Sequence, residues 1–375
     1  MFKPKSEKPI IRQKPFSPIQ REKATRKKVP AMRIIHLADL HIGTKFVNMP
    51  DNIKDELNTK LRNVFRNVIG YAENSGIDTI LMSGDVFDKN AVSLEDKKYF
   101  YDLIRINPGI DFYYIKGNHD RASKYSEDIA NLHSFEGVQS YIKGEARIIG
   151  YELGEDSSVL YDYHPFTTDK FNILMLHGDI ANARDKDYID LKRLDGKNID
   201  YFALGHIHKR GEGFVGEGKY AYPGCTMGRG FDETGKKGFL VLDTANNSTA
   251  FVGASEIEFE HIEIPMSSLN EASLKKEISE RLGEKDESKI TEIKLIGRAD
   301  FSPDTDDLMR TFLSLRHYLC VKNASKMALS YQRNENENSL RNMFINKVLS
   351  DPTLDDDSKQ KVIAYGLSKL MKEEI

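Results

Sequence analysis

The sequence "RIIHLADLHIG" (residues 33–43) joins a short apolar run to an Asp-x-His tripeptide, and this arrangement recurs along the chain. Continuous apolar runs of this kind are typical of strands that are buried on both faces of a sheet. Each run ends in a loop that contains Asp, His, Asn or Gly. The other four runs are "TILMSGDVFD" (79–88), "FYYIKGNHD" (112–120), "NILMLHGD" (172–179) and "YFALGHIHK" (201–209).

Helices are expected between some of these strands. Apolar residues recur on one face of residues 55–76, where Gly76 is a suitable end, and Ser93 is suited to cap a second helix over residues 93–106. Strands that alternate with crossover helices predict an α/β fold with parallel strand pairs. Ligands of such sheets bind beyond the carboxyl ends of the strands, which is where these loops lie.

The pattern changes after Pro265. Beyond it we expect helices at 268–283 and 304–319 and strands at 291–299 and 326–332. The polar stretch "QRNENENS" (332–339) then precedes two amphipathic helices, at 339–350 and 358–374. The chain is therefore expected to comprise a basic arm (1–31), a core (32–264), a small α+β capping domain (265–332), and a linker with C-terminal helices (333–375).

Composition narrows the class of protein. Residues 1–30 hold ten Lys or Arg residues, two Glu and five Pro, which predicts a disordered arm that is either a solvated tail or a contact for nucleic acid. The formal net charge is −3 overall, so the body of the chain is acidic. No apolar run approaches the ~20 residues of a membrane span. The two cysteines form no CxxC pair, which favours a reducing cytoplasm.

Five of the ten histidines lie in the loops that end the apolar runs. Carboxylate, amide and imidazole donors suit manganese, iron, zinc or nickel, and the lack of thiolates argues against a structural zinc site. Two divalent ions facing two Asp residues leave a charge that a hydroxide and a phosphodiester would balance, so we expect hydrolysis of a phosphate ester. The candidate residues are Asp39, His41, Asp85, Asn118, His119, His177, His206 and His208.

The ordered motifs resemble those of the calcineurin-like metallophosphoesterase superfamily. They stand here as Asp-Leu-His (39–41), Gly-Asp (84–85), Gly-Asn-His (117–119), Leu-His-Gly (176–178) and Gly-His-Ile-His (205–208). The resemblance implies a four-layer αββα core that binds two metal ions. By the same resemblance, one ion is held by Asp39, His41, Asp85 and His208.

The second ion is implied to lie among Asn118, His177 and His206, with Asp85 bridging the two ions. His119 is similar to the family histidine that assists the leaving group as an acid or as a charge stabiliser. The two histidines of Gly-His-Ile-His are expected to serve different ions, since residues i and i+2 of an extended segment point the same way, about 6.5–7 Å apart.

Finer details resemble one branch of this superfamily, the nuclease subunits of DNA double-strand-break repair complexes of the SbcD and Mre–Rad type. The stretch "AYPGCTMGRGFDETGKKGF" (221–239) carries this likeness, together with the order of core, capping domain and C-terminal helices. The resemblance implies a manganese-dependent 3′→5′ exonuclease and endonuclease with two manganese ions per subunit. It also implies a homodimer, DNA and a coiled-coil ABC-type ATPase (SbcC-like) as partners, and a nucleoid-associated, cytoplasmic location.

Some features leave alternatives open. Asp88 stands where some relatives carry His, and this departure puts the strength of exonuclease activity in doubt. Lys209, Arg210 and Arg121 follow the metal-binding motifs and are candidates for contacts with the DNA backbone, or are solvated surface residues. A phosphatase or a cyclic-nucleotide phosphodiesterase is the alternative enzyme on the same fold. A scaffold that only binds the ATPase is the alternative outside enzymes.

Overall fold

The computed structural model describes residues 31–47, 49–89, 92–120, 128–135, 137–152, 158–163, 165–299, 301–327, 340–355, 358–359, 362–363 and 365–366. The expected basic arm, apart from its last residue, lies outside the described residues, as does most of the expected helix at 358–374. Within the described part, no helix is both long and apolar enough to cross a membrane.

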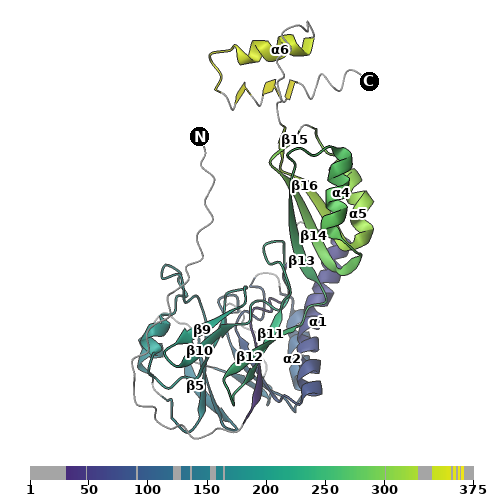
Figure 1. Ribbon diagram of the computed structural model, residues 1–375. Coiled ribbons are helices and arrows are strands. Elements are labelled where there is room, and N and C mark those ends of the chain that lie inside the picture. The colour runs from purple at the N-terminus through teal and green to yellow at the C-terminus, as the bar shows by residue number, and fades with distance from the viewer. Residues whose placement is uncertain are drawn as a thin grey trace.

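Two six-stranded mixed sheets form the core (Figure 1). The first sheet has the order β12-β11-β1-β2-β3-β4 and the second β5-β6-β7-β8-β10-β9. The strands of the first sheet are β1 (Arg33–Leu37), β2 (Thr79–Ser83), β3 (Asp111–Ile115), β4 (Leu132–Ser134), β11 (Gly238–Asp243) and β12 (Ser248–Gly253). Those of the second are β5 (Val138–Lys143), β6 (Ala146–Tyr151), β7 (Phe171–His177), β8 (Tyr201–Gly205), β9 (Gly211–Val215) and β10 (Gly218–Tyr222).

The five apolar runs of the sequence are the central strands β1, β2, β3, β7 and β8, as predicted. β1, β2 and β3 pair in parallel, and so do β7 and β8. They carry almost no polar alternation because both of their faces are covered. Between the two sheets one buried cluster joins Ile34 and Leu81 of the first sheet to Ile173 and Tyr201 of the second. This packing brings the carboxyl ends of strands from both sheets to the same end of the core.

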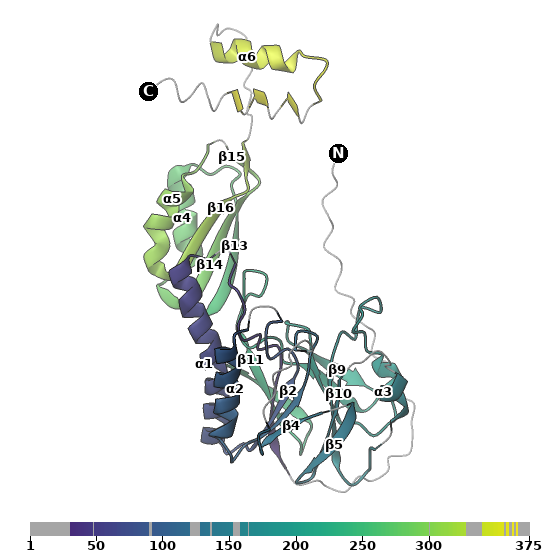
Figure 2. The ribbon, with the colours of Figure 1, turned by 180° about the vertical axis from the view of Figure 1, so that it is seen from behind.

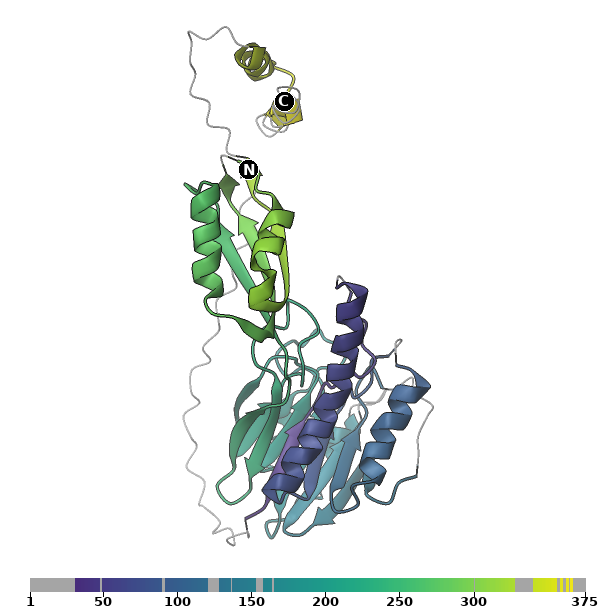
Figure 3. The ribbon, with the colours of Figure 1, turned by 90° about the vertical axis from the view of Figure 1, so that its right-hand side faces the viewer.

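Helices cover the outer face of the first sheet. α1 (Asp51–Ser75) ends at Gly76, whose φ of 63° allows the left-handed cap, and α2 (Leu94–Arg105) begins with a capping box at Ser93. Both helices lie side by side on that face (Figures 2 and 3). The outer face of the second sheet is covered by α3 (Ser158–Asp162), the 3₁₀ turn η1 (Leu191–Leu194) and the surrounding loops. The expected four-layer αββα core is thus present, with a thin fourth layer.

A small unit follows the core and is built on a parallel three-stranded sheet of order β13-β14-β16. The elements are β13 (Glu258–Pro265), α4 (Glu271–Leu282), β14 (Asp286–Ile296), β15 (Arg298–Ala299), α5 (Thr305–Phe312), η2 (Leu313–Leu315), β16 (Arg316–Asn323) and β17 (Lys326–Met327). β13 lies almost entirely before the expected boundary at residue 265. α6 (Leu340–Leu349) is the first of the two expected C-terminal helices.

The helix expected over residues 304–319 is wrong in its second half, because residues 316–323 form the strand β16. The buried Arg316 explains the change: its guanidinium donates to the backbone carbonyls of Leu282, the last residue of α4, and of Glu284, and so holds the chain in the sheet layer. Leu319, expected on the helix stripe, is instead buried in the core of the small unit.

The small unit packs against the core through α1, which extends beyond the first sheet toward it (Figure 3). His317 of β16 places Nε2 3.1 Å from Oε2 of Glu56 on α1. Phe259 and Ile290 of the small unit are buried in the same apolar cluster as the inner face of α1. This junction places the small unit next to the end of the core that carries the polar loops.

Candidate metal centre

The predicted ligands and His119 meet where the carboxyl ends of the two sheets come together. The loops after β1, β2 and β3 bring donors from the first sheet, and β7 and β8 bring donors from the second. These residues are Asp39 and His41 after β1, Asp85 after β2, Asn118 and His119 after β3, His177 at the end of β7, and His206 and His208 after β8.

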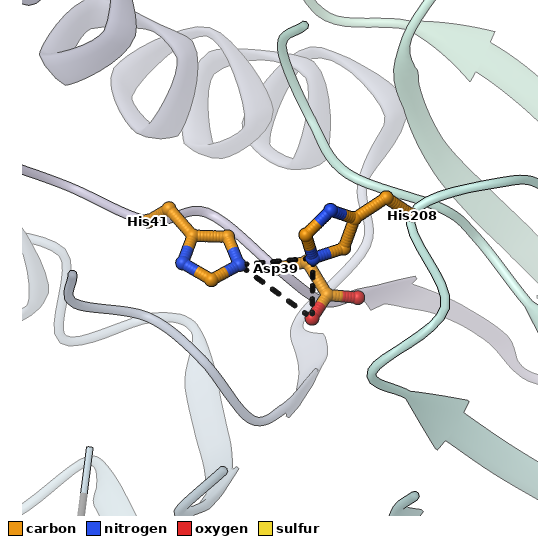
Figure 4. Close-up of side chains that lie close together, drawn as sticks. All are labelled: Asp39, His41 and His208. Carbon is orange, nitrogen blue, oxygen red and sulfur yellow. Dashed lines mark hydrogen bonds and ion pairs between the residues drawn. The ribbon is translucent and has the colours of Figure 1, made fainter. Parts of the chain in front are cut away.

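One group of donors consists of Asp39, His41 and His208 (Figure 4). The Nε2 atoms of the two imidazoles are 3.1 Å apart. Oδ1 of Asp39 lies 4.0 Å from Nε2 of His41 and 3.8 Å from Nε2 of His208. Because ligand atoms bind a transition metal at about 2.0–2.2 Å, donors 3–4 Å apart that face one point suit a single cation.

A second group consists of Asn118, His177 and His206. Oδ1 of Asn118 lies 3.1 Å from Nε2 of His177 and 3.1 Å from Nδ1 of His206. His206 therefore presents its Nδ1 atom to this group, whereas His177 presents Nε2. The backbone N–H of His206 donates to both carboxylate oxygens of Asp39, at 3.2 and 3.1 Å, which ties the two groups together.

Asp85 lies between the two groups. Its Oδ2 atom is 3.3 Å from Nε2 of His177 and 3.9 Å from Nε2 of His41. Its other oxygen, Oδ1, accepts a 2.8 Å hydrogen bond from the backbone N–H of His119. One oxygen is thus fixed by the backbone while the other faces both groups, which is the geometry that a bridging carboxylate needs.

Backbone contacts decide which atom of His177 faces the centre. Its Nδ1–H donates to the carbonyl of Ser83 at 2.8 Å, so Nε2 keeps its lone pair for a metal. Gly205 passes the same carbonyl so closely that a Cβ there would lie 1.9 Å from the Ser83 oxygen. The lack of a side chain at Gly205 therefore allows this close approach of the two backbone segments.

Burial and charge shift the pKa values of these donors. Burial raises the pKa of Asp39 to about 6 and lowers the pKa of His41 well below its usual value. For His177 burial acts in the opposite direction, but the hydrogen bond and charge of Asp85 raise its pKa to about 9. The pKa of Asp85 is held well below its usual value because His177 and His41 outweigh the effect of burial. The donor set of carboxylate, amide and imidazole groups fits two divalent cations.

His119 stands at the edge of this centre, with 34 % of its side chain exposed. Its ring packs edge-on against that of His41, with centroids 4.9 Å apart. Nδ1 of His119 lies 3.5 Å from Oδ1 of Asp88, whose Oδ2 accepts a 2.7 Å hydrogen bond from Thr44. Asp88 therefore lies beside the candidate acid.

Comparison with known proteins agrees with this arrangement. The family model of the calcineurin-like phosphoesterase superfamily domain matches residues 32–247. The chain belongs to this superfamily. The matched residues include every strand-end loop of the centre, and His/Asp groups that fit two metal ions are those of a metal-dependent phosphoesterase.

Curated relatives of this phosphoesterase include the uncharacterized metallophosphoesterase YhaO of Bacillus subtilis, 31% identical over 59% of each chain. The DNA double-strand break repair protein Mre11 of Methanocaldococcus jannaschii is 27% identical over 61% of this chain and 67% of its own. The chain thus spans about three fifths to two thirds of these relatives. Among solved structures, a dimetal phosphatase from Danio rerio is 11% identical with a TM-score of 0.36, over 56% of this chain and 91% of its own.

Three residues that sequence reasoning missed support the centre of the phosphoesterase. Glu233 and Arg229 form an ion pair beside His208, with Nη2 of Arg229 2.6 Å from Oε1 of Glu233. Asp120 is fully buried and accepts backbone hydrogen bonds from the loops after β2 and β3. In the sequence, these residues could have been found only from their position next to the motifs. Asp120 ends the Gly-Asn-His-Asp motif, and Glu233 lies in the 221–239 stretch.

The basic residues expected to contact DNA differ in their exposure and in their neighbours. Lys209 and Arg210 are both exposed beside the loop that carries His208. The guanidinium of Arg210 lies over the ring of Phe251, 4.4 Å from its centroid. Arg121 lies outside the described residues. A further cation, Lys237, donates to the carbonyl of His208 at 3.4 Å.

Proposed function

We propose that this phosphoesterase is a manganese-dependent DNA nuclease of a double-strand-break repair complex, with 3′→5′ exonuclease and endonuclease activity. The observation that carries the proposal is the position of Asp85, whose Oδ2 lies between two donor groups with His119 at their edge. That arrangement suits hydrolysis of a phosphodiester, because two cations can stabilise both the attacking and the leaving oxygen.

The roles of the residues follow from this geometry. Two divalent ions, when bound, would lower the pKa of a water and balance the charge of the phosphate. Asp39, His41 and His208 would hold one ion. Asp85, whose Oδ2 faces both donor groups, would serve this ion and the second one. His119 can protonate or stabilise the leaving oxygen, since Asp88 faces its Nδ1 and leaves Nε2 for the substrate.

DNA as the substrate is supported by the relatives and by the surface beside the centre. Several relatives carry the name DNA double-strand break repair protein Mre11, among them that of Archaeoglobus fulgidus, 26% identical over 72% of this chain and 66% of its own. Lys209 is exposed next to the centre, and a cation there suits the phosphates that flank a scissile bond. The small unit would act as the capping domain for the bound DNA.

The resemblance of the sequence motifs to those of repair nucleases leads us to propose a homodimer and a coiled-coil ABC-type ATPase partner. α6 offers two large apolar side chains to a partner: Leu340 is 70% exposed and Met343 is 63% exposed. A helix that exposes large apolar side chains suits docking in an apolar groove of a partner. Pull-down of the ATPase by the full chain, compared with a Leu340→Asp, Met343→Asp variant, would test this surface.

The experiment on function uses labelled duplex DNA, a small phosphomonoester and a cyclic nucleotide, each with manganese or magnesium. We expect manganese-dependent release of nucleotides from DNA, and its loss in a His119→Ala variant. Turnover of the small esters alone would instead identify a phosphatase or a cyclic-nucleotide phosphodiesterase. Intact DNA together with retained binding of the ATPase would identify a scaffold.

A further inference from the structure

Glu233 is a nearly buried carboxylate that contacts a predicted ligand without facing the metal centre itself. Its side chain is 10% exposed, and Oε1 lies 2.6 Å from Nδ1 of His208. Arg229 surrounds the same carboxylate: Nη2 donates to Oε1 at 2.6 Å, while Nε and the backbone N–H donate to Oε2 at 3.2 and 2.9 Å. Glu233 is therefore held in one orientation by several donors.

The hydrogen bond to Glu233 has a consequence for the tautomer of His208. A carboxylate only accepts, so Nδ1 of His208 must carry the proton, and Nε2 keeps the lone pair that faces Asp39 and His41. Nη2 of Arg229 also lies 2.8 Å from Nδ1 of His208. If Arg229 donated to Nδ1 instead, the ring proton would move to Nε2 and the imidazole would not bind a cation.

No other predicted imidazole ligand has such a partner in the described part of the chain. The far nitrogen of His177 donates to a backbone carbonyl. Nδ1 of His41 is buried and lacks a hydrogen-bond partner there, and Nε2 of His206 is 3.9 Å from Asp185, too far for a hydrogen bond. In the described residues, only the donor group of Asp39, His41 and His208 thus has a carboxylate at hydrogen-bond distance from the far nitrogen of an imidazole.

We infer that Glu233, paired with Arg229, is the positioning residue that fixes the tautomer of His208 and thereby sets the affinity of the cation site of Asp39, His41 and His208. The inference rests on the metal centre of the proposed function and is independent of whether DNA is the substrate. Partners of this kind behind a metal-bound imidazole typically contribute 10- to 100-fold in metal affinity.

The test measures manganese binding to the purified full chain by calorimetry and electron paramagnetic resonance, without any substrate. Glu233→Gln should lower the affinity for one of the two ions by about 10- to 100-fold and leave the affinity for the other unchanged. Glu292→Gln is the matched control, because Glu292 is equally buried and pairs with Nδ1 of His261 at 2.9 Å and with Lys322. The control should bind both ions as the wild type does.

A double variant separates the tautomer from simple loss of structure. In Glu233→Gln the Arg229 guanidinium is free to donate to Nδ1 of His208, so Arg229→Met in the same chain should restore part of the lost affinity. Wild-type affinity in Glu233→Gln would overturn the inference. Equal losses in the single and double variants would overturn the assignment of the tautomer.

A measurement on the wild type covers the case in which Glu233→Gln does not fold. The imidazole ¹⁵N shifts of His208, assigned with a His208→Gln variant, should show the proton on Nδ1. A proton on Nε2 would overturn the inference. Failure of the proposed function would look different, because the wild type would then bind two ions with the expected tautomer and leave DNA intact.

Discussion

Removal of the Asp120 carboxylate should destabilise the loops that position the predicted metal ligands. Asp120 is fully buried, and its two oxygens accept backbone hydrogen bonds from Val86 (3.1 Å), Phe87 (2.9 Å) and Gly117 (3.1 Å). The first two donors lie in the loop after β2, and the third lies in the loop after β3. Asp120 therefore fastens together the loops that carry Asp85 and Asn118.

The magnitude follows from the number of donors that lose their acceptor. A buried donor without a partner costs roughly 1–3 kcal/mol, so three such donors in Asp120→Ala should lower the free energy of unfolding by about 3 kcal/mol or more. Asp120→Asn keeps one acceptor oxygen and should cost roughly half as much. Both variants should also weaken manganese binding, because Val86 and Gly117 each adjoin a predicted ligand.

Urea unfolding followed by circular dichroism at pH 7 measures these differences, and calorimetry measures the binding of manganese. The order wild type, Asp120→Asn, Asp120→Ala is the expected order of decreasing stability. An Asp120→Ala variant within about 1 kcal/mol of the wild type would refute the reasoning, since it would mean that water or relaxed loops satisfy the three amides. Equal losses in the two variants would show that the hydrogen-bond count does not set the cost.

Three further outcomes are expected. His206→Ala and His208→Ala should each retain one manganese ion per chain and the double variant none, by elemental analysis; one ion retained in the double variant would mean that both histidines serve the same ion. Because the pKa of His177 is raised to about 9 and only the neutral ring binds a metal, manganese binding at pH 7 should release protons. The apparent affinity for manganese should therefore increase about tenfold for each pH unit up to pH 9, and more steeply than this below about pH 6, where Asp39 is also protonated. Calorimetry in buffers of different ionisation enthalpy that finds no proton release would contradict this. His119→Ala should keep both ions while kcat on a phosphodiester falls by about 10²–10⁴, and loss of an ion would instead make His119 a ligand.

The central strands and the donor residues are predictable from the sequence because both depend on local patterns. A strand covered on both faces must be apolar throughout, and a polar loop at its end is visible without any knowledge of its neighbours. The five runs beginning with residues 33–43 were therefore placed correctly. The apolar pattern alone does not divide these strands between two sheets, because strand partners are set by packing between distant segments; only the family resemblance implied the two-sheet core.

The supporting residues could not be predicted for the same physical reason. Glu233 acquires its role only because the loop that holds it packs beside His208, and Asp120 only because two loops converge on it. The half-wrong helix over residues 304–319 has a similar cause. Its apolar spacing fits a helix, but hydrogen bonds from Arg316 to the last residue of α4 and to the loop after it place residues 316–323 in the sheet.

Backbone strain at the predicted ligands shows that contacts from the rest of the fold are needed to bring these side chains together. Four of the seven non-glycine residues with positive φ in the described part of the chain are predicted ligands: Asp39 (53°), His41 (47°), Asp85 (52°) and His206 (96°). Such conformations cost roughly 1–3 kcal/mol each and persist where surrounding contacts impose them. Here the loop after β1 is fastened to the loop after β2, with the N–H of Asp39 donating to Gly84 and that of His41 donating to Asp85, both at 3.0 Å. The donors are thereby oriented before a cation arrives, which reduces the ordering that metal binding would otherwise require.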